Sequence, residues 1–161
     1  MRRQLIDERE HYHLVAASVT DPDWLTDIAA TADGRPVLMI GEGLTMYLTE
    51  ADGLALLRRV VDHFGSGEIQ FDAFNRLGIK AHWTNRVVTR AGATLHWGID
   101  GPADIVNAVA GLRLLAWISV FDSESFRGLG GGYRLMGKAM SSLSALRYMA
   151  QYHRYAFGPP G

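Results

Sequence analysis

The sequence predicts an α/β fold built around a parallel sheet, and two observations predict it. First, three short apolar stretches alternate with segments of helical periodicity: HLVAASV (His13–Val19), PVLMIGEG and EIQFDAF (Glu68–Phe74). Second, these stretches are continuously apolar rather than alternating, which is typical of strands buried on both faces. Short connections with right-handed crossovers then place the three strands parallel in one sheet.

Helix signals lie between the predicted strands. The first helix is predicted with Asp21 as its N-cap, Pro22 at its first position and Gly34 at its end. The second opens at Leu48 or Thr49, since acidic residues in the following turn favour a helix N-terminus. Its predicted inner face consists of Leu54, Leu57, Val60, Val61 and Phe64.

The second half of the sequence is less regular. Arg76–Gly92 starts with a helical pattern and then resembles a loop, and Pro102–Ala110 has apolar residues at helical spacing. Leu112–Phe121 is predicted as a strand, and Tyr148–Gly158 alternates like a last, partly exposed strand. Gly128–Tyr133 (GLGGGY) fails the dinucleotide fingerprint and is predicted to be a mobile loop. With no repeat or linker, we expect a single domain over residues 1–161.

Composition excludes several classes of function. The 161 residues carry 16 basic and 17 acidic side chains, a formal net charge of −1, which argues against a nucleic-acid or anionic-membrane surface. The absence of cysteine excludes disulfides and thiolate chemistry. The six histidines show no metal-ligand spacing, so no metal site is expected. No apolar run is long enough to span a membrane and no signal peptide is recognisable, so the expected compartment is the cytoplasm.

Polar residues follow each of the three predicted strands, where ligands bind in open α/β sheets. Residues 18–21 follow the first strand, and Glu42 between two glycines follows the second. The glycines allow a ligand close to the backbone, and the carboxylate can hold an ammonium group or hydroxyls. A Glu42 that only caps the next helix is an equal alternative. The third strand end carries Asp72, Asn75 and Arg76.

Simpler structural roles compete at several of these positions. Asp21 is explained by N-capping, and Asp72 by holding a turn. The aromatic residues Trp83, Trp97, Trp117 and Tyr133 could wall a pocket, although scattered aromatic residues more often belong to the core.

Several stretches, in this order, closely resemble the leucine carboxyl methyltransferase family and its branch of bacterial tetracenomycin-type O-methyltransferases. They are RRQLIDEREHYHLVAASVTDPDWL, RPVLMIGEGLTMYLTEADGLALLRRVVDHF, GEIQFDAF, LHWGID and GLRLLAWISVFD. The most specific piece is EGLTMYL (Glu42–Leu48), which matches a Glu-Gly-hydrophobic-x-x-Tyr-hydrophobic pattern of the family. The resemblance covers almost the whole chain.

This resemblance implies a Rossmann-like class I methyltransferase sandwich of three layers that uses S-adenosylmethionine. The implied cofactor contacts are Ser18, Val19, Asp21, Glu42, Gly43 and Tyr47. The implied chemistry is methyl transfer to a carboxylate or hydroxyl oxygen of a small, polyketide-like molecule. Trp83, Trp97 and Tyr133 are candidates for lining the acceptor site, and no general base is identified.

The resemblance also implies that the first two strands of the family's sheet have no counterpart here. Those strands include the glycine-rich cofactor loop, and their loss would leave sheet edges unpaired and apolar faces uncovered. Three hypotheses follow: a truncated or mis-started O-methyltransferase; a non-catalytic remnant that dimerises through the exposed sheet; and a ligand-binding or scaffolding module that uses the apolar second half.

Overall fold

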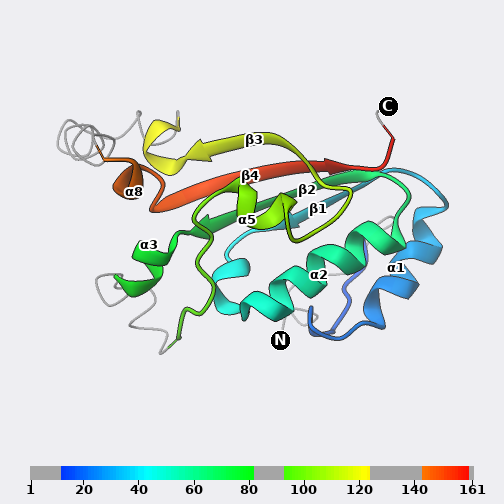
Figure 1. Cartoon of the computed structure of the whole chain (residues 1–161). Helices are drawn as coiled ribbons and strands as arrows, with labels where there is room; N and C mark the ends of the chain where they lie inside the picture. Colours follow the sequence, from blue (N-terminus) through cyan, green and yellow to red (C-terminus); the bar gives the residue numbers. More distant parts are fainter. Residues whose placement is uncertain (1–11, 82–92, 124–142, 160–161) are drawn as a thin grey trace.

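The computed structural model describes residues 12–81, 93–123 and 143–159, and its centre is a four-stranded sheet in the order β1-β2-β4-β3 (Figure 1). The strands are β1 (Val37–Gly41), β2 (Gly67–Phe74), β3 (Arg113–Ser119) and β4 (Ala150–Phe157). β1 and β2 are parallel, whereas β4 is antiparallel to both of its neighbours. Consequently β1, β2 and β3 run in one direction and end at the same edge of the sheet.

Three helices cover one face of this sheet (Figure 1). They are α1 (Trp24–Ala32), α2 (Glu50–His63) and α5 (Pro102–Val106). Their apolar side chains form one core with the inward residues of the strands, including Ile69 and Phe71 of β2 and Tyr155 of β4. The other helical segments of the described residues are η2 (Thr45–Tyr47), α3 (Arg76–Lys80), η4 (Val120–Asp122) and α8 (Ser144–Arg147).

Helix α2 follows the prediction closely. Thr49 is its N-cap, and the Thr49 hydroxyl accepts a hydrogen bond from the Asp52 N–H at 3.1 Å. Of the predicted inner face, Leu57, Val60 and Phe64 are buried, while Leu54 and Val61 pack half-buried against the core. Leu56 is also buried and was not in the predicted set.

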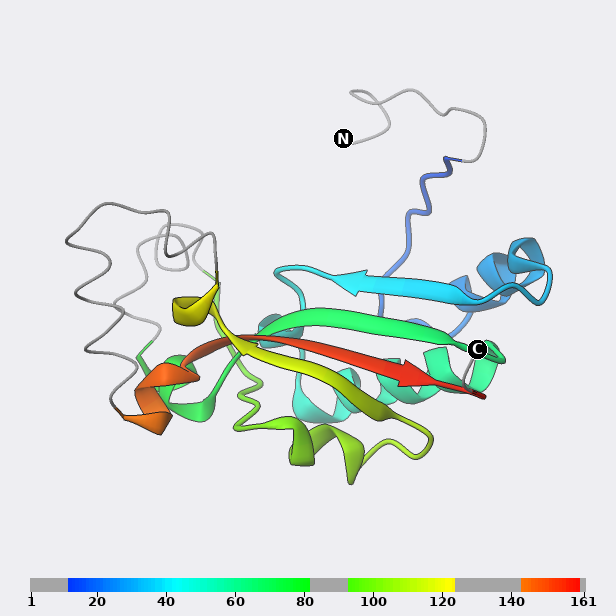
Figure 2. The ribbon, with the colours of Figure 1, turned by 90° about the horizontal axis from the view of Figure 1, so that it is seen from above.

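The opposite face of the sheet is uncovered by any helix of the described residues (Figure 2). Leu38 and Ile40 of β1 are 56% and 65% exposed there, and Ile118 and Tyr152 are each 46% exposed. β4 alternates between buried residues on the helix-covered side and more exposed residues on this side, so its predicted alternation is confirmed. We call this surface the open face.

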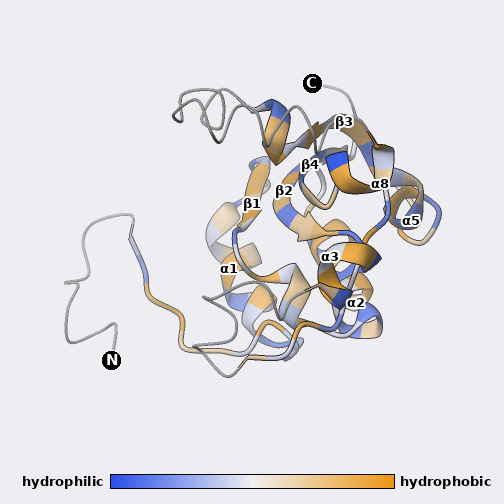
Figure 3. Cartoon of the chain, turned by 90° about the vertical axis from the view of Figure 1, so that its left-hand side faces the viewer, coloured by the Kyte–Doolittle hydropathy of each residue, from blue (hydrophilic) through white to orange (hydrophobic). Residues whose placement is uncertain are grey.

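The prediction of a buried strand at His13–Val19 is wrong. This segment is irregular, all of its residues except Leu14 and Val19 are exposed, and it lies to the side of the sheet (Figures 2 and 3). A parallel strand needs ladder hydrogen bonds and burial on both faces. The described part of the chain supplies neither, because β1 is the edge of the sheet and pairs with β2 alone.

The start of α1 also differs from the prediction. Asp23, not Asp21, occupies the N-cap position, and the helix begins at Trp24 rather than at Pro22. The reason is local: the Asp21 carboxylate accepts a hydrogen bond from the Asp23 N–H at 3.0 Å and closes a turn before the helix. The predicted end is close, since Asp33 and Gly34 both have positive φ angles.

Two elements of the second half are shorter than predicted. α5 ends at Val106 rather than at Ala110, and Gly111, with φ +85°, then redirects the chain into β3. β3 ends at Ser119 rather than at Phe121, because the Ser119 hydroxyl accepts a hydrogen bond from the Phe121 N–H and caps η4. The predicted loop at Gly128–Tyr133 lies outside the described residues.

Candidate functional site

The Gly-Glu-Gly turn directly follows β1 and is fastened to β2. The Gly43 N–H donates to Asp72 Oδ1 at 2.7 Å, and the Thr45 hydroxyl donates to the Asp72 carbonyl oxygen at 2.6 Å. Gly43 has φ +60°, a conformation that favours glycine, and a side chain there would meet no atom within 4 Å. The turn is therefore held rigidly on its inner side and open on its outer side.

Glu42 lies at the tip of this turn, and its side chain stabilises no element of the described residues. Its carboxylate makes no hydrogen bond or ion pair with the residues that the structure describes, and Thr49, not Glu42, caps α2. The alternative that Glu42 caps the following helix is thus not realised. An exposed, unpartnered carboxylate at a strand end remains available to a ligand.

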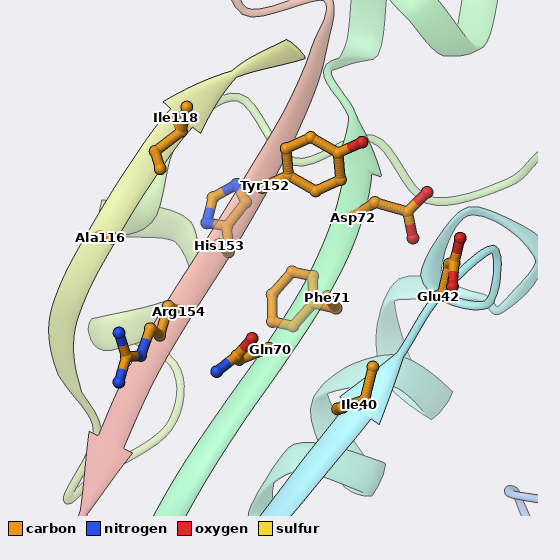
Figure 4. Close-up of a pocket in the computed structure, with 10 residues that line it drawn as sticks. All are labelled: Ile40, Glu42, Gln70, Phe71, Asp72, Ala116, Ile118, Tyr152, His153 and Arg154. Atoms are coloured by element: carbon orange, nitrogen blue, oxygen red, sulfur yellow. The ribbon is translucent and has the colours of Figure 1, made fainter. Parts of the chain in front are cut away.

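Glu42 lines a hollow of about 330 Å³ on the open face, which we call the open-face hollow (Figure 4). Asp72 and Tyr152 lie near Glu42, and Arg154 lies at the far side (Figure 4). Its volume is at the lower end of the range of small-molecule sites, about 300–1,000 Å³.

Of the charged side chains in and beside this hollow, some form ion pairs and others do not. Arg154 donates two hydrogen bonds to Glu68, at 2.7 and 2.9 Å, and these hydrogen bonds hold the pKa of Glu68 below its usual range. Glu42 and Asp72 have no such cation among the described residues. This end of the hollow is therefore suited to a positively charged ligand group.

The structure does not bring Ser18, Val19 and Asp21 to the same place. The Arg59 guanidinium donates to the carbonyl oxygens of Val19 and Thr20, at 3.3 and 3.0 Å, and so ties this segment to α2. The Ser18 hydroxyl bonds to the Thr20 hydroxyl. None of the three predicted residues lines the open-face hollow.

The remaining predicted site residues are dispersed. Tyr47 lies in η2, is 41% exposed, and does not line the open-face hollow. Trp97 is only 4% exposed, and its ring packs so tightly on Gly53 that a Cβ there would lie 2.0 Å from it. Trp97 therefore belongs to the core, and its role in lining an acceptor site stays a prediction. Trp83 and Tyr133 lie outside the described residues.

A second hollow, of about 450 Å³, was not predicted and lies beside the carboxyl ends of β2 and β3. We call it the aromatic hollow, because the stacked rings of Trp117 and Tyr148 line it, together with Asp100 and Leu77. From the sequence, Trp117 was identified only as one of several aromatic residues, and Asn75 as a residue that follows the third predicted strand. No local pattern connects Tyr148 or Asp100 with them, because these residues come from separate parts of the chain.

The buried pair His153 and Tyr155 lies beneath the open-face hollow, on the core side. His153 stacks on Phe71, and its Nδ1 shares a 2.6 Å hydrogen bond with the Tyr155 hydroxyl. Burial lowers the pKa of His153 to about 4, although the Asp104 carboxylate opposes the shift. His153 also contributes to the floor of the open-face hollow, and its enclosed imidazole is neutral at physiological pH.

The described residues contain neither a metal-binding cluster nor a membrane-spanning helix. No group of three or more His, Asp or Glu side chains within residues 12–81, 93–123 and 143–159 is placed to hold a metal ion. In the same part of the chain, no helix is long and apolar enough to cross a membrane.

Comparison with curated proteins identifies two relatives. The chain is 36% identical over 157 residues to the tetracenomycin polyketide synthesis O-methyltransferase TcmP of Streptomyces glaucescens, covering 98% of this chain and 57% of TcmP. It is also 36% identical over 123 residues to the S-adenosyl-L-methionine-dependent methyltransferase dpfgK of Gibberella zeae, covering 70% of this chain and 41% of that protein. The chain thus spans about half the length of the curated relatives it matches. No protein-family profile matches it.

Solved structures share the fold at low sequence identity. A methyltransferase candidate from Thermobifida fusca superposes with a TM-score of 0.66 at 13% identity, over 98% of this chain and 58% of that one. A DUF574 family protein from Streptomyces avermitilis gives 0.57 at 15% identity, over 90% and 54%. The chain is therefore a homologue of the TcmP-type O-methyltransferases and has the mixed α/β fold of methyltransferase structures.

Proposed function

We propose that this chain is part of an S-adenosylmethionine-dependent O-methyltransferase, as its relatives are named. It would transfer a methyl group to a carboxylate or hydroxyl oxygen of a small, polyketide-like molecule. One observation carries the proposal. The unpartnered Glu42 carboxylate stands on an open glycine turn at the end of a parallel strand, beside a hollow in which negative charge is uncompensated. The homology to methyltransferases supports it.

The residues of this end of the hollow fit the charged groups of the cofactor. S-adenosylmethionine carries an ammonium and a sulfonium, and when bound it supplies an electrophilic methyl group. Glu42 would attract these positive groups, and Gly43 leaves room for them next to the backbone. Asp72 would act through the turn, since its carboxylate fixes the Gly43 N–H.

The fit is incomplete for the other predicted contacts. Ser18, Val19 and Asp21 lie outside the open-face hollow, so their contact with the cofactor stays a prediction that requires this segment to move off Arg59. Tyr47 also stays a prediction. No general base is assigned; a carboxylate acceptor needs none, because it is ionised at neutral pH.

The test is calorimetric titration of the chain with S-adenosylhomocysteine, alongside a Glu42→Gln variant. Loss of one charge-assisted contact corresponds to about 1.5–3 kcal/mol, or roughly a 10- to 150-fold weaker Kd. The matched control is Asp27→Asn, which removes an exposed carboxylate of α1 that does not line the open-face hollow and should leave Kd unchanged. Equal binding by wild type and Glu42→Gln, or no binding to the folded chain, would refute the proposal.

A second function is favoured by the open face itself. Leu38 and Ile40 are exposed on an edge strand whose outer backbone groups pair with no strand of the described residues. Such an edge promotes pairing between chains, so a non-catalytic module that self-associates through β1 is the alternative. Sedimentation measurements on wild type and an Ile40→Lys variant test it: self-association abolished by the lysine supports the module, and a monomeric wild type excludes it.

A further inference from the structure

We propose that two copies of this chain pair through β1, antiparallel and centred on Met39, so that Glu42 of each copy lies against Arg35 of the other. In this arrangement the second copy occupies the carboxylate that the proposed function assigns to the cofactor. The pairing itself depends only on the edge strand, whereas its effect on the cofactor rests on the proposed function. The register, the ion pair and this competition go beyond the simple edge pairing considered above.

The two edges of the sheet are protected to different degrees. β3 begins with Arg113, and its pairing register shifts between Leu114 and Ala116. Charged residues and irregular register both discourage pairing at an edge. β1 (Val37–Gly41) contains no charge, no proline and no register shift, and its outer side faces no strand of the described residues (Figure 2). β1 is therefore the edge at which a further strand can add.

The backbone of β1 determines which residues form the new hydrogen bonds. The Val37 N–H donates to the Ser66 carbonyl oxygen at 3.1 Å, so Val37 turns its backbone groups toward the β2 side. Because these groups alternate in direction along a strand, Leu38 and Ile40 turn theirs outward. In an antiparallel pair centred on Met39, Leu38 lies opposite Ile40 of the second copy, and the two residues exchange both N–H···O bonds. This register also overlaps β1 over its full length.

The side chains of the same two residues complement each other. Leu38 and Ile40 lie on the open face and are 56% and 65% exposed, and Ile40 lines the open-face hollow (Figure 4). In the register centred on Met39, each Leu38 packs beside Ile40 of the second copy, and such cross-strand apolar pairs stabilise a sheet. Pairing therefore covers apolar surface that is otherwise exposed to water.

The charges at the two ends of β1 are complementary. Between residues 30 and 45 the chain carries one basic residue, Arg35, and two acidic residues, Asp33 and Glu42. Neither Arg35 nor Glu42 has an ion pair with the described residues, although Arg35 donates to carbonyl oxygens at the end of α1. In the register centred on Met39, Glu42 lies opposite Pro36 of the second copy and next to its Arg35. Two-fold symmetry repeats this contact at the other end, which favours a second copy of this chain as the occupant.

The second copy and the cofactor compete for the same carboxylate. In the proposed function Glu42 attracts the ammonium and sulfonium groups of S-adenosylmethionine, but a Glu42 neutralised by Arg35 of the second copy cannot. Gly43, which is open on its outer side in one copy, would lie opposite Arg35 of the other. The dimer would therefore keep the turn closed, and the cofactor would bind the monomer.

Single cysteines test the register, because the chain contains no cysteine of its own. In the proposed pair the two Met39 residues face each other with Cα atoms about 4.5 Å apart, within reach of a disulfide. The two Leu38 residues are offset by two positions, about 8–9 Å apart, and cannot be bridged. Mild oxidation should give a covalent dimer of Met39→Cys but not of Leu38→Cys, although Leu38 is more exposed. No cross-link in Met39→Cys, or equal cross-linking of both variants, would overturn the register.

A charge exchange tests the ion pair by sedimentation equilibrium. Arg35→Glu and Glu42→Arg should each raise the dimer Kd about tenfold, because each variant brings like charges together at both ends. The double variant restores opposite charges and should return to within about threefold of wild type, which a folding defect would not do. Arg113→Glu on the other edge strand is the matched control and should change nothing. A double variant as weak as the single variants would contradict the ion pair.

The competition is measured on the wild-type dimer. S-adenosylhomocysteine at ten times its Kd should raise the dimer Kd about 100-fold, because each of the two separated copies binds one molecule. An unchanged dimer Kd in a chain that binds S-adenosylhomocysteine would refute the competition. The cysteine and charge-exchange experiments use no ligand, so their outcomes decide the pairing even if the S-adenosylhomocysteine titration of the proposed function fails.

Discussion

His153 provides a quantitative test of the core beneath the open face. Its side chain is 2% exposed, and its Nε2 is buried without a hydrogen-bond partner. Burial lowers the pKa of His153 from an ordinary 6.5 to about 4, so the folded protein holds this imidazole neutral. In the unfolded chain the same group takes up a proton as the pH falls through 6.5.

The sign and size of the effect follow from this difference. The contribution of His153 is fully present above pH 6.5 and is lost as the pH falls toward 4, because the unfolded state binds the proton first. A difference of about 2.5 pKa units corresponds to about 3 kcal/mol in all. Of this, about 2 kcal/mol should be lost between pH 7.5 and pH 5.0.

The assay is urea unfolding at those two pH values for wild type and for His153→Phe, which keeps a ring against Phe71 but cannot titrate. The free energy of unfolding should fall by about 2 kcal/mol more in wild type than in the variant. The variant also loses the hydrogen bond between His153 and the Tyr155 hydroxyl. This loss lowers the free energy of unfolding equally at both pH values, so it cancels when the two pH values are compared. An equal fall in both proteins would refute a buried, neutral His153.

Two further substitutions test the packing that positions the sites. Gly53→Ala in α2 should destabilise the fold by about 1–3 kcal/mol, despite better helix propensity, because its Cβ would overlap the ring of Trp97. Gly65→Ala, which meets no atom within 4 Å, is the control and should stay within about 0.5 kcal/mol in the same denaturant assay. Asn75→Ala should cost about 2 kcal/mol, because the buried Asn75 amide both caps α3 and donates to the carbonyl oxygen of Ala145; an unchanged urea midpoint would contradict these roles.

The elements that the sequence predicted well carry their own local signals. α2 has a capping threonine, an acidic first turn and apolar residues at helical spacing, and β4 alternates in register with its two faces. The strand predicted at His13–Val19 is not formed. An apolar stretch becomes a buried strand only against neighbouring elements, and the described residues do not provide them there. Strand formation depends on those neighbours and is not visible in a short window.

The candidate sites likewise differ in how much of each is visible in a short stretch of sequence. Glu42 could be predicted because a glycine flanks it on each side at a strand end, which is visible in the sequence. The structure adds that Thr49, not Glu42, caps α2. The aromatic hollow could not, since Trp117, Tyr148 and Asp100 meet only when β3 and β4 pair and residues 98–100 cross beside them. The burial of Trp97 also depends on a distant partner, the glycine at position 53.

In the proposed function, the turn after β1 holds the positive end of S-adenosylmethionine. Amide hydrogen exchange with and without S-adenosylhomocysteine is the decisive experiment for this role of the turn, because it reports where the ligand binds as well as whether it binds. We expect slower exchange at residues 41–44, centred on the Gly43 N–H that Asp72 already holds. Protection confined to other parts of the chain, with residues 41–44 unchanged, would contradict it.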